Sequence, residues 1–109
     1  MTVYLVQGDA GSQVKAIITR EDTGLPVDLS DATPRLKFKK KNTTTVLATI
    51  TSIASSPDDL EAGVAVFAFT STHLDVAPGE YVGEIEVSFN SGSIETVYEQ
   101  ITIMVREDY

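Results

Sequence analysis

Side chains alternate in character along residues 80–89, and this is the clearest pattern in the chain. One set of alternate positions is Tyr81, Gly83, Ile85, Val87 and Phe89, and the set between them is Val82, Glu84, Glu86 and Ser88. A period of two residues places the two sets on opposite faces of a β-strand. Because one face is apolar and the other carries two acids, the pattern predicts a strand of an antiparallel sheet with one wet face.

The rest of the chain repeats this design between regular turn signals. Residues 77–79 and 90–92 contain proline, glycine and asparagine, which favour turns, and they bracket the first strand. Further strands are predicted at residues 2–6, 12–19, 35–41, 46–53, 63–70, 93–98 and 101–105. Short strands at this spacing are typical of a β-sandwich or barrel, so we expect an all-β fold of about seven to nine strands.

The connecting segments and the inward-facing positions complete the predicted fold. Residues 30–34 are expected to be irregular, because Pro34 cannot donate a backbone hydrogen bond. The polar residues 54–62 predict a loop, and residues 71–76 predict one helical turn capped by Ser71 or Thr72. The expected core is Leu36, Phe38, Ile50, Phe67, Phe69, Tyr81, Ile85, Val87 and Phe89.

The length and composition of the chain bound its class. A length of 109 residues suits one domain, spanning residues 1–109. The chain contains no cysteine, so disulfide bonds and thiolate metal sites are excluded. No apolar run approaches the roughly 18 residues of a membrane span, and the N-terminus lacks the basic and apolar regions of a signal peptide. We therefore expect a domain held by packing alone, with no membrane partner.

Charge is distributed unevenly along the chain. The net charge is −8, but residues 1–57 carry seven basic and five acidic side chains, whereas residues 58–109 carry one basic and eleven acidic. Five of the eight basic residues lie within residues 35–41. Such asymmetry fits a nucleic-acid site, a polar assembly interface or a solvated strand face. The acidic total argues against nucleic acid as a partner.

Two surfaces are candidate contact sites. On the basic strand, Arg35, Lys37 and Lys39 are expected to point outward. The strand at residues 63–70 is apolar on both faces, which places Val64 and Val66 on an outer face. That face either contacts a partner or is covered by a loop.

The opposite charges of the two halves suggest a mode of assembly. The basic strand of one copy would attract the acidic half of another, head to tail. On this hypothesis, the double substitution Lys37→Glu with Lys39→Glu weakens assembly and leaves thermal stability nearly unchanged.

The residues that enzymes use do not form a convergent set. His73 is the only histidine, and a triad or zinc site needs further partners beside it. The acids in residues 58–61 lack the spacing of a calcium-binding loop. Glu84 and Glu86 share one strand face, but that face is expected in water rather than in a pocket. We therefore expect no enzymatic activity, no cofactor and no metal.

A series of motifs nevertheless resembles a known family. Gln7-Gly8-Asp9 follows the opening strand, and the series continues through residues 21–33, 63–67 and 78–89. In order and spacing it resembles the immunoglobulin-like domain at the N-terminus of tailed-phage upper baseplate proteins, which also occurs as small stand-alone phage virion proteins. The resemblance covers almost the whole chain. Pro34, Asp31 and Phe69 depart from the family's usual residues, which affects strand boundaries rather than the fold.

The resemblance implies an immunoglobulin-like antiparallel β-sandwich that serves as a non-enzymatic virion component. Its partners would be other phage structural proteins or copies of itself, and it would be synthesised in the host cytoplasm. Head decoration, neck or collar, and tail or baseplate all remain open. Two other classes also remain open. One is a carbohydrate-binding or adhesin-like module using exposed Tyr4, Tyr98 or Tyr109, and the other is an accessory domain of an enzyme.

Overall fold

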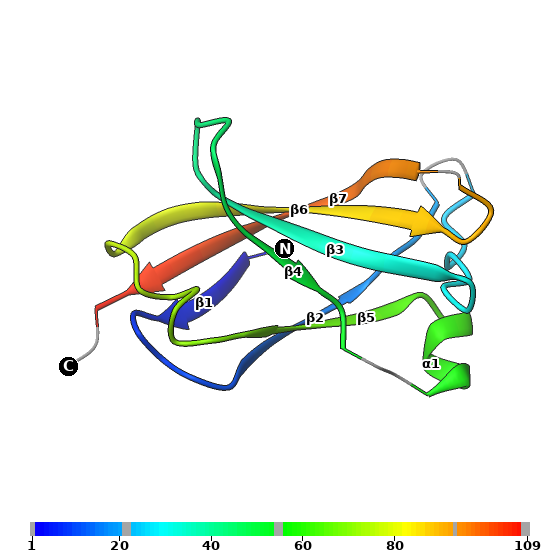
Figure 1. Ribbon diagram of the computed structural model, residues 1–109, viewed down its shortest axis with the longest axis horizontal. Helices are drawn as coiled ribbons and strands as arrows, with labels where there is room; N and C mark the ends of the chain where they lie inside the picture. The colour runs from blue at the N-terminus through cyan, green and yellow to red at the C-terminus, as the bar shows by residue number, and fades with distance from the viewer. Residues whose placement is uncertain (1, 21–22, 54–55, 93, 108–109) are drawn as a thin grey trace.

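Strands dominate the computed structural model, which describes the backbone of residues 2–20, 23–53, 56–92 and 94–107 and their side chains except those of residues 94–99. Within these residues, seven strands form two facing sheets (Figure 1). The larger sheet has five strands in the order β1-β7-β6-β3-β4, and the smaller pairs β2 with β5. The strands are β1 (Thr2–Val6), β2 (Ser12–Ile17), β3 (Ala32–Lys40), β4 (Val46–Thr51), β5 (Val64–Phe69), β6 (Gly79–Phe89) and β7 (Ile94–Arg106).

Strand pairing follows the alternation read from the sequence. The neighbours β3–β4, β3–β6, β6–β7 and β2–β5 are antiparallel, as the one-sided hydrophobic pattern predicts. The pair β1–β7 is parallel, because the chain enters and leaves the sheet in the same direction at this edge. The buried apolar residues of the two sheets form one cluster, so the core lies between the two layers. The predicted β-sandwich is therefore confirmed.

The centre of the core is an aromatic cluster that spans both sheets. The ring of Phe38 on β3 stacks on Tyr81 of β6 with centroids 5.0 Å apart. The same ring meets Phe69 of β5 edge-on at 5.6 Å. Of the predicted core, only Phe89 is incompletely buried, since it lies at the end of β6. Further buried residues beyond that predicted set are Ile18, Val27, Leu29, Leu74, Ile101 and Ile103.

The expectation that Pro34 interrupts regular structure is wrong. Pro34 lies inside β3, buried, opposite Val87 of β6. Its carbonyl oxygen accepts the N–H of Ser52 at 3.0 Å, so its backbone faces the β4 side. Proline has no backbone N–H to donate toward β4. Because β4 ends at Thr51, that missing donor falls at the end of the ladder between β3 and β4. The ladder between β3 and β6 loses nothing.

Two connecting segments differ in detail from the prediction. The predicted loop contains a short helix, α1 (Pro57–Glu61), whose N-cap Ser56 accepts the N–H of Asp59 at 3.3 Å. The turn after β5 forms as expected but is capped by Thr70, whose Oγ1 accepts the N–H of His73 at 3.2 Å. No helix in the described part of the chain is long and apolar enough to cross a bilayer.

Candidate interaction surfaces

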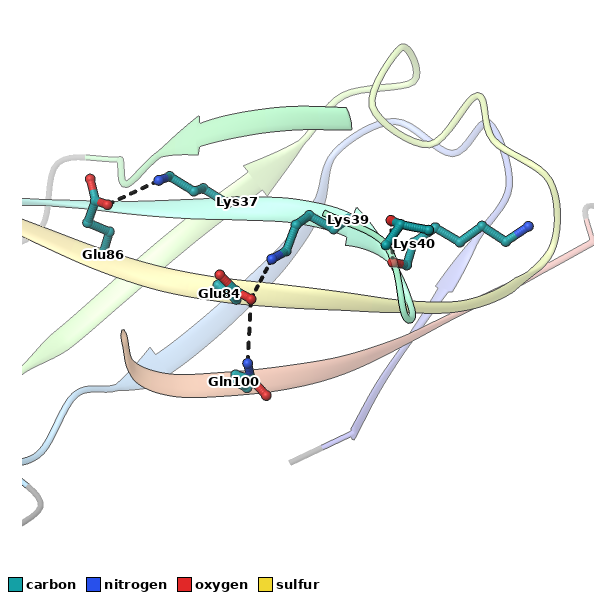
Figure 2. Close-up of polar contacts among 7 residues, drawn as sticks. Lys37, Lys39, Lys40, Glu84, Glu86 and Gln100 are labelled. Carbon is teal, nitrogen blue, oxygen red and sulfur yellow. Dashed lines mark hydrogen bonds and ion pairs between the residues drawn. The ribbon is translucent and has the colours of Figure 1, made fainter. Parts of the chain in front are cut away.

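A row of ion pairs crosses the outer face of the larger sheet, between β3 and β6. Lys37 donates to Glu86 at 3.1 Å, and Lys39 donates to Glu84 (Figure 2). In the antiparallel register Lys37 lies directly opposite Glu84, so each lysine reaches along the sheet. Cross-strand pairs of opposite charge stabilise sheets modestly. The row of ion pairs therefore stabilises the pairing of β3 with β6. It also holds the charged ends of the lysine and glutamate side chains in place.

This row explains the uneven charge of the sequence. The basic strand β3 and the acidic strand β6 belong to different halves of the chain but are neighbours in the sheet. Arg35 completes the row, with its Nη1 donating to Ser88 Oγ at 3.0 Å. The predicted interface cations thus have partners within the chain. Whether they also contact another protein stays a prediction.

Reversing two of these charges is expected to destabilise the fold. In Lys37→Glu with Lys39→Glu, carboxylates replace cations beside Glu84 and Glu86, which costs about 1–2 kcal/mol in the free energy of unfolding. This replaces the sequence-based expectation of nearly unchanged stability. Chemical denaturation measures the difference.

Two controls separate the ion pairs from net charge. Adding Glu84→Lys and Glu86→Lys restores opposite signs and is expected to recover most of the loss. Lys15→Glu with Lys40→Glu changes the net charge equally but breaks none of the described ion pairs. Equal destabilisation by that control would show that the row itself contributes nothing.

At the end of the row the polar surface is hollowed. A hollow of about 350 Å³ lies beside the end of β3 and against the neighbouring parts of β6 and β7, lined in part by Lys39, Lys40, Glu84 and Gln100. Figure 2 shows Lys40 extending away from the paired side chains. Its ammonium has no ion-pair partner in the part of the chain that the structure describes. The lining mixes paired charges with amides and hydroxyls and contains no apolar pocket.

The second predicted surface, on β5, is only partly present. Val64 is 7% exposed and offers almost no surface, because β5 starts beside α1, which packs on it. Val66 is half-buried, and its carbonyl oxygen accepts the N–H of Ile53 at 2.9 Å. The exposed apolar side chains here are Ile17, 55% exposed, and Ile53, 41% exposed. The expectation that Val64 lies exposed on an outer face is therefore wrong.

Sequence reasoning missed Ile53 for a physical reason. Its position beside β5 depends on how the chain leaves β4 and crosses to the smaller sheet, and no local pattern encodes that path. The exposure of Ile17, in contrast, can be predicted from the sequence, because alternation along its strand places it on the outward face.

The titratable groups considered for catalysis have structural partners. His73 Nδ1 accepts the N–H of Thr70 at 3.1 Å, and its ring lies edge-on to Phe69. Glu84 and Glu86 are held by the lysines of the row. Among the described residues, no three histidine or acidic side chains cluster closely enough to hold a metal ion.

Of the three candidate tyrosines, one can be placed. Tyr4 is 59% exposed on β1, and the guanidinium carbon of Arg106 lies 4.4 Å from its ring centroid. One face of the ring is thus engaged in a cation–π contact. The side chains of Tyr98 and Tyr109 lie outside the described residues.

The comparisons with known proteins concern the fold. No protein-family model matches the chain, and no curated protein matches it. Among solved structures, CopC from Methylosinus trichosporium OB3b is similar, with 14% identity, a TM-score of 0.50, and coverage of 99% of this chain and 86% of that one. Murine CRIg is also similar, with 9% identity, a TM-score of 0.45, and coverage of 96% of this chain and 92% of that one.

A third similar structure is AggA, the major subunit of aggregative adherence fimbriae type I from Escherichia coli. It has 12% identity and a TM-score of 0.36, with coverage of 95% of this chain and 90% of that one. Identities this low indicate shared fold alone. The likeness to CopC and the two-sheet arrangement confirm the predicted immunoglobulin-like β-sandwich.

Proposed function

We propose that this immunoglobulin-like domain is a non-enzymatic structural protein of a tailed-phage particle and acts by binding other proteins of the particle. The observation that carries the proposal is the ordered motif series and its resemblance to the family of upper baseplate domains and stand-alone virion proteins. In the structure, these motifs lie in turns and strands of the sandwich. Gln7-Gly8-Asp9 forms the turn after β1, residues 63–67 open β5, and residues 78–89 form β6 with its preceding turn.

A binding role, rather than catalysis, is supported by what the described surface offers. The groups considered for catalysis, Glu84, Glu86 and His73, are engaged in ion pairs and a turn. Exposed apolar side chains lie instead along strands, notably Ile17 on β2 and Leu47 on β4. Where exposed apolar groups form a contiguous patch, they mark contact sites between proteins. The partners we propose are other virion proteins or copies of this chain, without nucleic acid.

Co-sedimentation with infectious particles tests the proposal. An antibody against the chain is used to probe density-gradient fractions of a purified phage lysate. We expect the protein in the fractions that contain particles, and to stay there after a second gradient at high salt. Protein found only among the soluble components would contradict a structural role.

A glycan-binding module is the second candidate, favoured by the exposed ring of Tyr4. Aromatic rings are common platforms in carbohydrate sites, but here Arg106 engages one face. Glycan-array binding that Tyr4→Ala abolishes, together with absence from particles, would establish this function in place of the first.

A further inference from the structure

The strand β4 is an edge strand with no charged residue. It forms one border of the larger sheet, next to β3 (Figure 1). Residues 43–53 contain neither a charged side chain nor proline or glycine, and most are β-branched. Natural edge strands normally carry lysine, proline or a bulge in the open edge to block pairing with other chains. Here the irregularity, between Phe38 and Lys39, affects only the first end of β4.

The backbone of β4 presents unpaired groups to that open side. Ser52 donates its N–H to Pro34 of β3, so Ser52 faces β3. Successive residues of an antiparallel ladder face alternate sides. Thr49 and Thr51 therefore direct N–H and C=O away from β3. Neither threonine has a backbone partner on that side among the residues that the structure describes.

The other sheet borders differ from β4. On β5, the carbonyl oxygen of Val66 is already taken by the N–H of Ile53. On β2, Lys15 stands in the middle of the strand, where it disfavours pairing with another chain. On β1, the Arg106 guanidinium lies over Tyr4 and would place a cation beside an incoming strand. Within the described sheets, β4 is thus an uncharged edge without a backbone partner on its open side as far as Thr51; just beyond it, Ile53 bonds to β5.

We propose that the open edge of β4 pairs antiparallel with β4 of a second copy of this chain, across a two-fold axis. Such pairing joins two larger sheets into one continuous sheet, with Thr49 and Thr51 of each copy exchanging backbone hydrogen bonds. The proposal does not rest on a role in virions, because its test uses the purified protein alone.

Charge favours a second copy as the occupant. In a two-fold pairing, β4 of one copy lies beside β4 of the other. Any charged side chain on this strand would therefore face a charge of the same sign across the interface, which is destabilising. The strand β4 carries none. Elsewhere, copies with a net charge of −8 repel one another. The strand β3, with its cations, separates β4 from the acidic β6.

Exposed apolar side chains at both ends of β4 also favour pairing with a second copy of the chain. Val46 and Leu47 are 43% and 49% exposed at the start of the strand, and Ile53 is 41% exposed just beyond its end. These are three of the seven large apolar side chains exposed in the described structure. In the antiparallel dimer, the start of one strand lies beside the end of the other, so these residues cover one another.

Sedimentation velocity over a range of protein concentrations tests the dimer. The wild-type protein is expected to change from monomer to dimer as concentration rises, and more readily at high salt, because salt screens the repulsion between acidic copies. A protein monomeric up to millimolar concentration would overturn the proposal. So would a dimer that dissociates at high salt, the result expected for head-to-tail attraction through Arg35, Lys37 and Lys39.

Charge variants test the surface. Thr49→Lys with Thr51→Lys and Thr49→Glu with Thr51→Glu are each expected to be monomeric, whereas an equimolar mixture restores the dimer with one copy of each. The control Gln13→Lys with Ile17→Lys, on β2, should dimerise as wild type does. Persistent dimers in both β4 variants, or loss of the dimer only in the control, would place the contact elsewhere.

Hydrogen exchange gives a readout that needs no variant. The amides of Thr49 and Thr51 have no backbone partner among the described residues of the monomer, so they should exchange rapidly in dilute protein and slowly in concentrated protein. Concentration-independent exchange of both amides would overturn the proposal even if a dimer forms by another face.

Discussion

Replacing Phe38 with alanine is expected to lower the free energy of unfolding by about 3–5 kcal/mol, much of the stability of a small domain. Phe38 is fully buried and packs against Phe69 from the facing sheet and Tyr81 from the neighbouring strand. Its removal leaves a cavity between the sheets and ends two ring contacts, each worth about 0.5–1.5 kcal/mol within that total. Urea denaturation followed by fluorescence or circular dichroism measures the loss.

Phe89→Ala is the matched control for this substitution. Phe89 has the same side chain but is only half-buried at the end of β6, so its loss should cost less than half as much. If the two variants were equally stable, the assignment of Phe38 to the centre of the core would be wrong.

Gly63→Ala is expected to lower the free energy of unfolding by about 2–5 kcal/mol, although it adds a single methyl group. A Cβ at this position would lie 2.5 Å from the carbonyl oxygen of Ile18 and 3.2 Å from that of Val27. Both contacts are with backbone that cannot rotate away. The residue also has φ +77°, which disfavours any side chain.

Gly24→Ala separates these two causes. Gly24 has a similar φ of +71°, but no atom lies within 4 Å of where its Cβ would be. We expect it to cost about 1–2 kcal/mol, the conformational part alone. Equal losses in thermal or urea unfolding would mean that the close approach at Gly63 relaxes without penalty.

Local alternation was sufficient to predict the strands and most of the core. The strand at residues 80–89 is β6 almost to the residue, because its side chains repeat with the period of a strand buried on one face. Pro34 was misjudged because its effect depends on which neighbour its backbone faces. That neighbour, the end of β4, lies well beyond Pro34 in the chain.

The candidate surfaces depended on sheet order, which alternation does not encode. The cations of β3 and the acids of β6 were both visible in the sequence, but not that they are neighbours and form ion pairs. For the same reason, alternation places Val64 on an outer face, although α1 packs on its strand. The uncharged run in β4 was equally readable, but only the sheet order shows that this strand is an open edge.

The proposal that this chain is a structural part of a phage particle is tested most directly by its copy number in purified particles. Quantitative mass spectrometry gives that number relative to the major capsid and tail-tube proteins. We expect a fixed number that is a multiple of the symmetry of one ring or shell, because structural proteins occupy equivalent positions. A high multiple would indicate head or tail-shaft decoration, and a low one the neck or baseplate. Absence from particles, or a trace amount that varies between preparations, would contradict the proposal.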